Sequence, residues 1–435
     1  MNEDKRIEKN KAIGQKKKET ILRHSQMDCK SYTMKIQSNK LSSLQKEQLK
    51  LLFVEAKWFK NYVLSWMEED KINNKIGKFD SSIKKIIHKD KDMNDIEVDL
   101  KQLGSQIKQS LVVEMMSNMK AIKTLKENGY QKGGRLKYVK EIKSIPLNQY
   151  KITYQIKGKN YIKVQGIKGL LKVNGLEQIL IPQTEICNAR LLNKPNGYYI
   201  QIVTYKPKES KKKPNDIVGL DFGIGSALTL SNGLKFNVKV QESESLKRMQ
   251  RKLSRQKKGS KNRYKTINKI NKLNQKQSNI KNNISNQIVS FLLNNYDKVV
   301  MQDEMISKWH KGLFGKNVQH SILGRIKKKL LESDNVYVLS KSVATTKTCS
   351  KCGCKVNLKL KDRTFHCPQC GIEMDRDVHA AQNMIWFYEK FLKIPTEHRD
   401  FKPVEIETST LLSKLIRDNA SYMSVKQEVA NLDWQ

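Results

Sequence analysis

Five of the seven cysteines fall within 22 residues near the C-terminal end of the sequence. Cys349 and Cys352 form one Cys-x2-Cys pair, Cys367 and Cys370 form a second, and fourteen residues separate the pairs. This spacing is typical of a zinc ribbon, in which two tight turns place four thiolates around one ion. Cys354 stays outside the set because Cys352-Gly-Cys354 is too short a spacing. The pattern predicts one structural Zn²⁺, and the alternative is a group of reduced thiols without metal.

Acidic residues follow two short apolar runs and the second cysteine pair. Asp221 ends the run that begins at Ile217, Asp303 and Glu304 follow Val299–Met301, and Asp375 and Asp377 follow Cys370. Carboxylates gathered from separate strand ends can hold two Mg²⁺ ions, which prefer oxygen ligands and can stabilise the attacking and leaving oxygens of a phosphodiester. The acids therefore indicate a candidate nuclease site.

Each acid also has a simpler interpretation. Asp221 could be a turn residue beside Gly223 and Gly225, and Asp377 could cap a helix that begins at Val378. From the residues alone these alternatives stay open.

Fourteen Lys and Arg residues lie between Lys247 and Lys281 without a single acid. Apolar residues continue at helical spacing through this stretch, so we expect a basic helical hairpin that turns near Gly259. A solvated helix face is the alternative to a polyanion-binding surface. The residues that we expect to contact nucleic acid are Lys247, Arg248, Arg251, Lys252, Arg255, Lys257, Lys258, Lys261, Arg263 and Lys265.

The overall composition supports a polyanionic partner. The 435 residues include 84 Lys and Arg against 43 Asp and Glu, a formal net charge of +41, yet 38% are hydrophobic. A folded chain with this charge repels itself unless a polyanion neutralises it. No apolar run approaches the roughly 18 residues of a membrane span, and no apolar run follows the Lys-rich N-terminus. We expect a cytoplasmic protein of several domains without a membrane partner, associated with the nucleoid when bound to DNA.

The elements that must position these residues follow from hydrophobic periodicity. Alternation predicts strands at 32–36, 151–156, 161–164, 187–192 and 198–205, and a capping box at Ser42 and Gln45 opens a helix-rich stretch to about Asn128. Farther along, strands at 217–222, 227–230, 234–238, 299–301 and 335–339 alternate with helices at 322–331 and from Val378. This order indicates a mixed α/β sheet after a smaller β-domain that a helical segment interrupts.

The order of the second-half motifs resembles TnpB, the RNA-guided nuclease of bacterial insertion sequences, and the miniature type V CRISPR effectors that share its layout. The resemblance rests on Gly219–Gly223, the basic hairpin, the acids after Met301, Thr345–Gly353 with the second cysteine pair, and Asp375–Asn383. It covers about residues 216–385 and, more loosely, the β-domain before them.

The resemblance implies a multidomain α+β fold in which a small β-barrel-like wedge domain with a helical recognition insertion precedes an RNase H-like (RuvC) α/β nuclease domain with an inserted zinc ribbon. The expected boundaries are a basic tail at 1–30, the wedge domain at 31–41 and 135–212, the recognition insertion at 42–134, the nuclease domain at 213–342 and 372–395, the ribbon at 343–371 and a C-terminal tail at 396–435.

It also implies the site. The first and third catalytic acids fall on Asp221 and Asp377, which with a middle acid would hold two Mg²⁺. The family commonly has an acid where this chain has Gln302, and often Asn where it has His379. Side chains alternate along a strand, so Glu304 would share the face of Gln302, and we expect Glu304 to be the middle acid, with Asp303 next.

The implied activity is RNA-guided cleavage of double-stranded DNA beside a short flanking motif, by two-metal phosphodiester hydrolysis, with a guide RNA made from the transposon end. Gln302 motivates the alternative, an RNA-guided DNA-binding protein with an inactive nuclease that acts as a repressor. A transposase acting by itself is disfavoured because nothing resembles the Tyr or Ser site of a strand-joining recombinase. The sequence leaves the oligomeric state open, a dimer included.

Overall fold

The structure is a computed structural model that describes residues 3–69, 82–89, 94–129, 135–208, 216–223, 228–309, 315–359, 362–392 and 423–427. The chain divides into two compact units, Met1–Ser210 and Lys211–Gln435. Among the described residues, none of the helices has both the length and the apolar character of a membrane span.

The first unit is built on antiparallel sheets. One sheet has the order β1-β9-β8-β4, with β1 at Met27–Lys35, β9 at Gly197–Pro207, β8 at Glu185–Lys194 and β4 at Ser144–Leu147. A second sheet joins β5 (Tyr154–Lys157), β6 (Tyr161–Val164) and β7 (Leu171–Lys172). The strands expected at 187–192 and 198–205 are confirmed as β8 and β9, which form a hairpin with Pro195 and Asn196 as its loop and Gly197 at a φ of +117°.

Helices and a hairpin occupy the segment between β1 and β4. They are α2 (Ser43–Glu69), the pair β2 (Lys85–Lys89) and β3 (Asp95–Asp99), and α3 (Ser105–Glu127). The capping box is confirmed, because the Gln45 backbone N–H donates to Ser42 Oγ and the Ser42 backbone N–H donates to Gln45 Oε1, both at 3.1 Å. The β2–β3 hairpin was not predicted. Short 3-10 turns lie at Ser38–Lys40 and Leu176–Gln178.

The N-terminal segment, expected to be a tail, forms a 23-residue helix, α1 (Glu3–Ser25). Near its end Arg23 and His24 bind the carboxylate of Glu185 on β8, at 3.0 and 2.9 Å, and the His24 ring stacks on Tyr205 of β9. The helix is therefore fixed to the sheet at its C-terminal end.

The second unit contains a six-stranded mixed sheet of order β14-β13-β10-β11-β12-β17. Its strands are β10 (Ile217–Phe222), β11 (Leu228–Leu230), β12 (Leu234–Val238), β13 (Lys298–Gln302), β14 (Val336–Leu339) and β17 (Met423–Gln427). β10, β13 and β14 are parallel, and the other pairings are antiparallel. The mixed α/β sheet is therefore as expected, except that β17 adds an edge strand from the segment expected to be a C-terminal tail.

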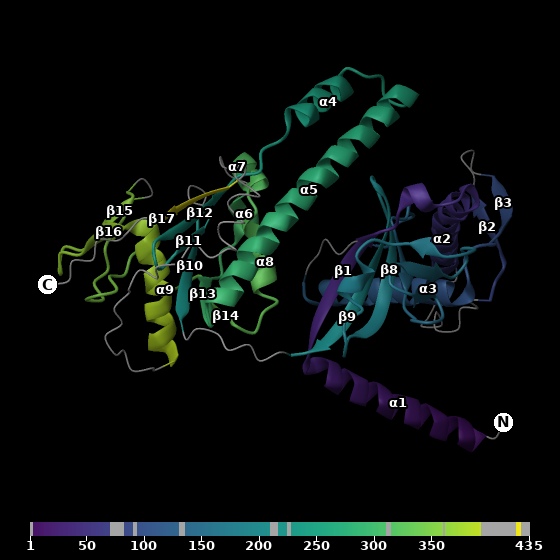
Figure 1. The fold of residues 1–435 in the computed structure, drawn as a ribbon, viewed down its shortest axis with the longest axis horizontal. Coiled ribbons are helices and arrows are strands. Elements are labelled where there is room, and N and C mark those ends of the chain that lie inside the picture. Colours follow the sequence, from purple (N-terminus) through teal and green to yellow (C-terminus); the bar gives the residue numbers. More distant parts are fainter. Residues whose placement is uncertain are drawn as a thin grey trace. The chain divides into compact units, whose positions relative to one another are not determined.

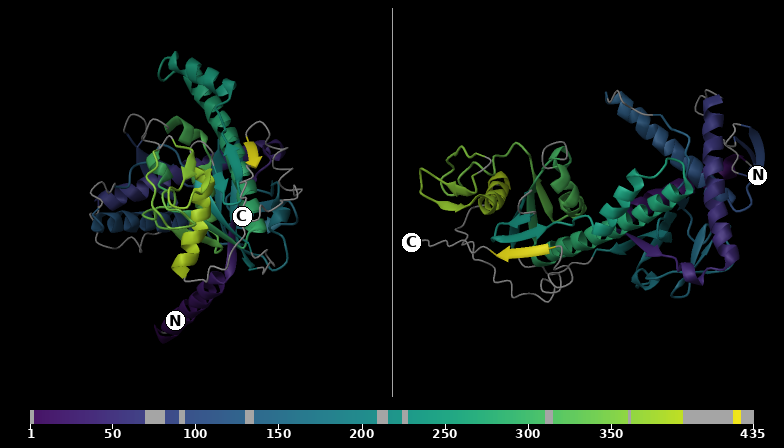
Figure 2. Two further views of the ribbon diagram at one scale, coloured as in Figure 1. Left: turned by 90° about the vertical axis from the view of Figure 1, so that its left-hand side faces the viewer. Right: turned by 90° about the horizontal axis from the view of Figure 1, so that it is seen from above.

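Helices cover both faces of this sheet (Figures 1 and 2). One face packs on α5 (Lys261–Asn295) and α8 (Leu323–Leu330), and the other packs on α9 (Arg376–Leu392). The short helices α6 (Ile306–Trp309) and α7 (Gly315–His320) connect β13 to α8, and α4 (Glu244–Ser254) folds back along α5. A two-stranded sheet of β15 (Thr364–His366) and β16 (Glu373–Asp375) leads directly into α9.

In the first unit, the buried carboxylate of Glu55 on α2 fixes the approach to α3. It accepts hydrogen bonds from the backbone N–H groups of Lys101, Gln102 and Leu103 at 3.0, 2.9 and 2.8 Å. Burial raises the pKa of Glu55, and these hydrogen bonds act in the opposite direction.

We predict that Glu55→Ala lowers the free energy of unfolding by about 3 kcal/mol, because it leaves the buried N–H of Leu103 and two partly buried N–H groups without an acceptor. The measurement is guanidinium chloride unfolding of the full chain, with Glu47→Ala as control, since Glu47 is an exposed residue of the same helix. Equal stability of the two variants would show that the Glu55 hydrogen bonds do not hold α2 to this segment.

Candidate functional site

Asp221 lies in β10 on the sheet face that α9 covers. Alternate residues of the strand face the core formed with α5 and α8, namely Val218, Leu220 and Phe222. Gly219 and Asp221 therefore point to the opposite face. Asp221 is paired within the sheet to Thr229 of β11, so the interpretation of Asp221 as a turn residue is wrong.

Gly219 allows α9 to approach β10 closely. A Cβ on Gly219 would lie 1.8 Å from the backbone oxygen of Ala381, a distance that no side chain tolerates. Asp377 is four residues, about one helical turn, before Ala381. The close contact thus holds the first turn of α9 against the sheet near Asp221.

Several charged groups act on the carboxylate of Asp221. Burial raises its pKa well above the usual range, and the negative charges of Asp377, Glu304 and Asp375 raise it further, while Arg376 acts in the opposite direction. Acids from β10, from the segment after β13 and from α9 are therefore near enough to repel one another. A divalent cation would relieve this repulsion, and carboxylates are the donors that Mg²⁺ prefers.

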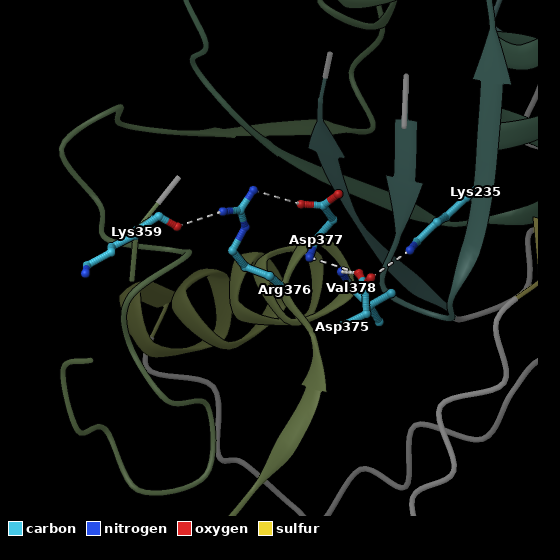
Figure 3. Close-up of polar contacts among 6 residues, drawn as sticks. All are labelled: Lys235, Lys359, Asp375, Arg376, Asp377 and Val378. Atoms are coloured by element: carbon cyan, nitrogen blue, oxygen red, sulfur yellow. Dashed lines mark hydrogen bonds and ion pairs between the residues drawn. The ribbon is translucent and has the colours of Figure 1, made fainter. Parts of the chain in front are cut away.

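Asp375, rather than Asp377, caps α9. Its Oδ1 accepts from the backbone N–H groups of Asp377 and Val378, both at 3.0 Å, and its Oδ2 binds Lys235 Nζ of β12 at 2.9 Å (Figure 3). The interpretation of Asp377 as a cap is therefore wrong. The carboxylate of Asp377 does not cap the helix, whereas both carboxylate oxygens of Asp375 accept hydrogen bonds.

Arg376 lies beside the acids, and the sequence did not indicate a role for it. Its guanidinium lies 3.6 Å from Asp377 Oδ1 and donates to the backbone oxygen of Lys359 at 3.4 Å (Figure 3). Arg before an acid carries no signal by itself, and only the structure shows that it faces the carboxylates.

The two candidate middle acids differ in their surroundings. β13 ends at Gln302, so strand alternation does not extend to Asp303 or Glu304. Asp303 is exposed and binds Lys327 Nζ at 2.6 Å, which lowers the pKa of Asp303. Glu304 is half-buried, burial raises its pKa, and its charge acts on Asp221. Burial and charge therefore favour Glu304 over Asp303 as the middle acid.

Gln302 has a structural role in this arrangement. Its side chain is 5% exposed, its Nε2 donates to the backbone oxygens of Ser340 and Val343 at 3.0 and 2.7 Å, and its Oε1 accepts from Thr345 Oγ1 at 3.0 Å. A carboxylate could not donate to these two carbonyl groups. An amide is thus required here for reasons unrelated to a metal.

A second buried amide connects the same loop to α9. Asn383 Nδ2 donates to the backbone oxygens of Thr345 and Thr348, both at 2.6 Å, and Thr348 directly precedes Cys349. His379, one turn earlier on α9, is fully buried and stacks on Phe365 of β15, with ring centroids 3.6 Å apart. Burial lowers the pKa of His379 to about 4, so the ring is neutral. These contacts fix the cysteine-rich segment to α9.

The sulfur atoms of the four cysteines predicted to bind zinc lie close together. Cys349 and Cys370 sulfurs are 3.5 Å apart, as are those of Cys352 and Cys367, and all four lie within 4.8 Å of one another. In the described ranges they are the one group of three or more potential ligands gathered this closely. Cys354 stays outside, as expected. The set is a possible zinc site, and its sulfur donors match what Zn²⁺ prefers.

The turns at the two Cys-x2-Cys pairs have the same backbone geometry. Gly353 N–H donates to Cys349 O and Gly371 N–H donates to Cys367 O, each at 2.9 Å, with φ of +74° and +71° at the glycines. Burial acts to raise the pKa of Cys367, but backbone N–H groups of Cys370 and Gln369 donate to its sulfur and lower the pKa to about 6. A thiolate is therefore favoured before any metal binds.

The basic hairpin is present as α4 and α5, with Gly259 at a φ of +84° in the turn. Two of the residues that we expected to contact nucleic acid bind other residues of the protein instead. Arg263 donates to the backbone oxygens of Leu253 and Gln256, and Lys247 binds Glu244 at 2.7 Å. The others are exposed: Arg248, Arg251, Lys252, Arg255, Lys257, Lys258, Lys261 and Lys265.

We predict about one zinc per chain, lost in Cys367→Ser and retained in Cys354→Ser, because only the first change removes one of the four gathered sulfurs. Elemental analysis of the purified variants measures this. Loss of zinc in both variants, or no zinc in the starting protein, would contradict the assignment.

Two family models match the second unit and the chain just before it. Residues 200–308 match the model described as "Probable transposase" (OrfB_IS605), and residues 320–384 match "Cas12f1-like, TNB domain". The two matches contain all three proposed acids and the four cysteines.

Curated relatives match at moderate identity. "Putative RNA-guided DNA endonuclease InsQ" of Escherichia coli (strain K12) is 28% identical over 214 residues, which is 43% of this chain and 53% of the relative. "Putative RNA-guided DNA endonuclease" of Streptomyces pristinaespiralis is 28% identical over 178 residues, 39% of this chain and 44% of the relative. The matches span about half the length of these relatives.

Among solved structures, a chain from the cryo-EM structure of a Cas12f1–sgRNA–target DNA complex aligns with a TM-score of 0.44 and 15% identity, covering 78% of this chain and 81% of that one. The residues matched by the two family models contain the motifs on which the resemblance rests. The chain is therefore similar to TnpB and to the miniature type V effectors, as its motifs predicted.

Proposed function

We propose that the protein is an RNA-guided DNA endonuclease of a transposable element that cuts double-stranded DNA beside a short flanking motif. The observation that carries the proposal is the electrostatic environment of Asp221, whose pKa is raised by burial and then by the negative charges of Asp377 and Glu304, which come from two other elements. Support also comes from the curated relatives, which are named as RNA-guided DNA endonucleases.

The three acids would hold two Mg²⁺ ions, which would supply Lewis-acid stabilisation of the attacking and leaving oxygens. The protein's own contribution is placement. β10 presents Asp221, the turn after β13 presents Glu304, and the Asp375 cap presents Asp377 at the start of α9. Arg376, beside Asp377, would balance the carboxylate charge or contact the DNA phosphate.

In this proposal, each expected domain is assigned to one of the two units by its place in the sequence. The second unit would be the nuclease domain with a ribbon that binds one structural Zn²⁺, and the first would supply the wedge and recognition domains within the boundaries predicted above. The partners would be a guide RNA and the target duplex, held largely through their backbones by basic surface such as the α4–α5 hairpin.

The inactive-nuclease alternative was motivated by Gln302. Because the Gln302 amide is used in three hydrogen bonds of the loop after β14, its presence has a structural reason and gives no support to loss of activity. The repressor function therefore has no specific observation in its favour.

We predict that Asp221→Asn and Glu304→Gln each reduce Mg²⁺-dependent cleavage of guide-matched DNA at least a hundredfold while target binding stays within about twofold, because each removes a metal ligand and leaves the basic surface unchanged. Asp303→Asn is the matched control and should keep most of the cleavage, since Asp303 pairs with Lys327. The measurements are cleavage and filter-binding assays on the complex with its co-purified RNA.

The outcomes separate the two candidates for the middle acid and the two functions. Loss of cleavage in Asp303→Asn but not in Glu304→Gln would reverse the assignment of the middle acid. Specific target binding without any cleavage by the starting protein would replace the nuclease by the repressor.

A further inference from the structure

A stripe of exposed lysines runs along α5 beyond the residues that the hairpin motif singled out. Lys261, Lys265, Lys269, Lys272 and Lys276 are spaced by three or four residues, so they lie on one side of the helix, and all five are exposed. At 1.5 Å per residue the lysines repeat about every 4.5–6 Å. This repeat is on the scale of successive phosphates along one strand of nucleic acid.

The stripe ends at a cavity of about 480 Å³ between α5 and the segment that joins β12 to α4. Leu273 and Ile280 of α5, both half-buried, and the buried Val240 supply its apolar wall, and Lys276 and Lys239 line it as well. One acid, Glu242, also lines the cavity, and its charge acts on the nearby Lys281. The volume lies in the usual range of ligand sites, about 300–1,000 Å³. Apolar wall and flanking cations suit a flat base with an attached phosphate.

The walls of the cavity are fixed within the second unit. Val240 N–H donates to the backbone oxygen of His320 at 3.2 Å, and Gln277 Nε2 of α5 donates to the backbone oxygen of Gln241 at 3.0 Å. Ser243 caps α4 by accepting from Leu246 N–H. The cavity is therefore bounded by segments that are hydrogen-bonded in place, and not by the hairpin tip.

We propose that a single strand of nucleic acid lies along this lysine stripe and seats one base in the cavity at its end. The proposal rests on the proposed function and makes it more specific, because it assigns a strand path and a nucleotide pocket to the basic hairpin. Lys269, Lys272 and Lys276 bind phosphates, and Leu273 and Ile280 pack against the base.

The phosphate contacts are tested by fluorescence anisotropy on the full chain with a 15-nucleotide oligouridylate and an oligodeoxythymidylate of equal length. Lys272→Gln/Lys276→Gln should weaken binding about tenfold and reduce the slope of log K against log salt by about 1.4, roughly 0.7 for each lost contact. The matched control is Lys328→Gln/Lys341→Gln, which removes two exposed lysines from α8 and the loop after β14. It should change the affinity and the slope by less than half as much.

The base contact is tested by photo-crosslinking with 4-thiouridine or 4-thiothymidine in the same oligomers. Crosslinks should map to residues 239–245 or 273–280, and Leu273→Ala should reduce them at least threefold without changing the salt slope. The preferred oligomer identifies the strand as RNA or DNA.

Three results would overturn the proposal: equal effects of the two double variants, crosslinks confined to the hairpin tip, or equally strong binding of a blunt duplex to the stripe. Each would leave the nuclease proposal standing, since guided cleavage would persist. Failure of the starting protein to bind any oligomer would also overturn the proposed strand path and pocket, and the cleavage assays test the proposed function separately.

Discussion

The arrangement of the second unit depends on one close contact, in which the backbone of α9 lies against β10 at Gly219. Without a side chain there, the Ala381 carbonyl group occupies the place of a Cβ. Since Asp221 is two residues beyond Gly219 on the same face and Asp377 is one turn before Ala381, this contact sets the separation of two of the three acids. Any widening of it would move the start of α9 away from the sheet.

Buried amides extend this contact to the rest of the site. Gln302, at the end of β13, holds the loop after β14, and Asn383 on α9 holds the same loop at Thr345 and Thr348. Thr348 precedes Cys349. One hydrogen-bonded network therefore connects the cysteine-rich segment, the strand that leads to Glu304 and the helix that carries Asp377. Metal binding by the cysteines would thus stabilise the helix that presents an acid.

Much of this arrangement was predictable from local patterns. The capping box at Ser42, the basic hairpin and the gathering of the two cysteine pairs depend on residues near one another in sequence, so local patterns predicted them. The roles of Gln302 and Asp375 were not predictable, because their partners, such as Thr345 and Lys235, lie 43 and 140 residues away. The β17 strand was missed for the same reason, since pairing with β12 is a tertiary contact.

The central claim is that the α9–β10 contact assembles a site for divalent cations. The most direct test is Mn²⁺ titration followed by electron paramagnetic resonance on the starting protein, on Gly219→Ala and on Gly324→Ala, whose added Cβ meets nothing within 4 Å. Retained zinc in each variant would report that the four cysteines are still gathered. The account predicts Mn²⁺ binding in the starting protein and in Gly324→Ala, and affinity at least tenfold weaker in zinc-loaded Gly219→Ala. Unchanged Mn²⁺ affinity in Gly219→Ala, or no binding by the starting protein, would contradict it.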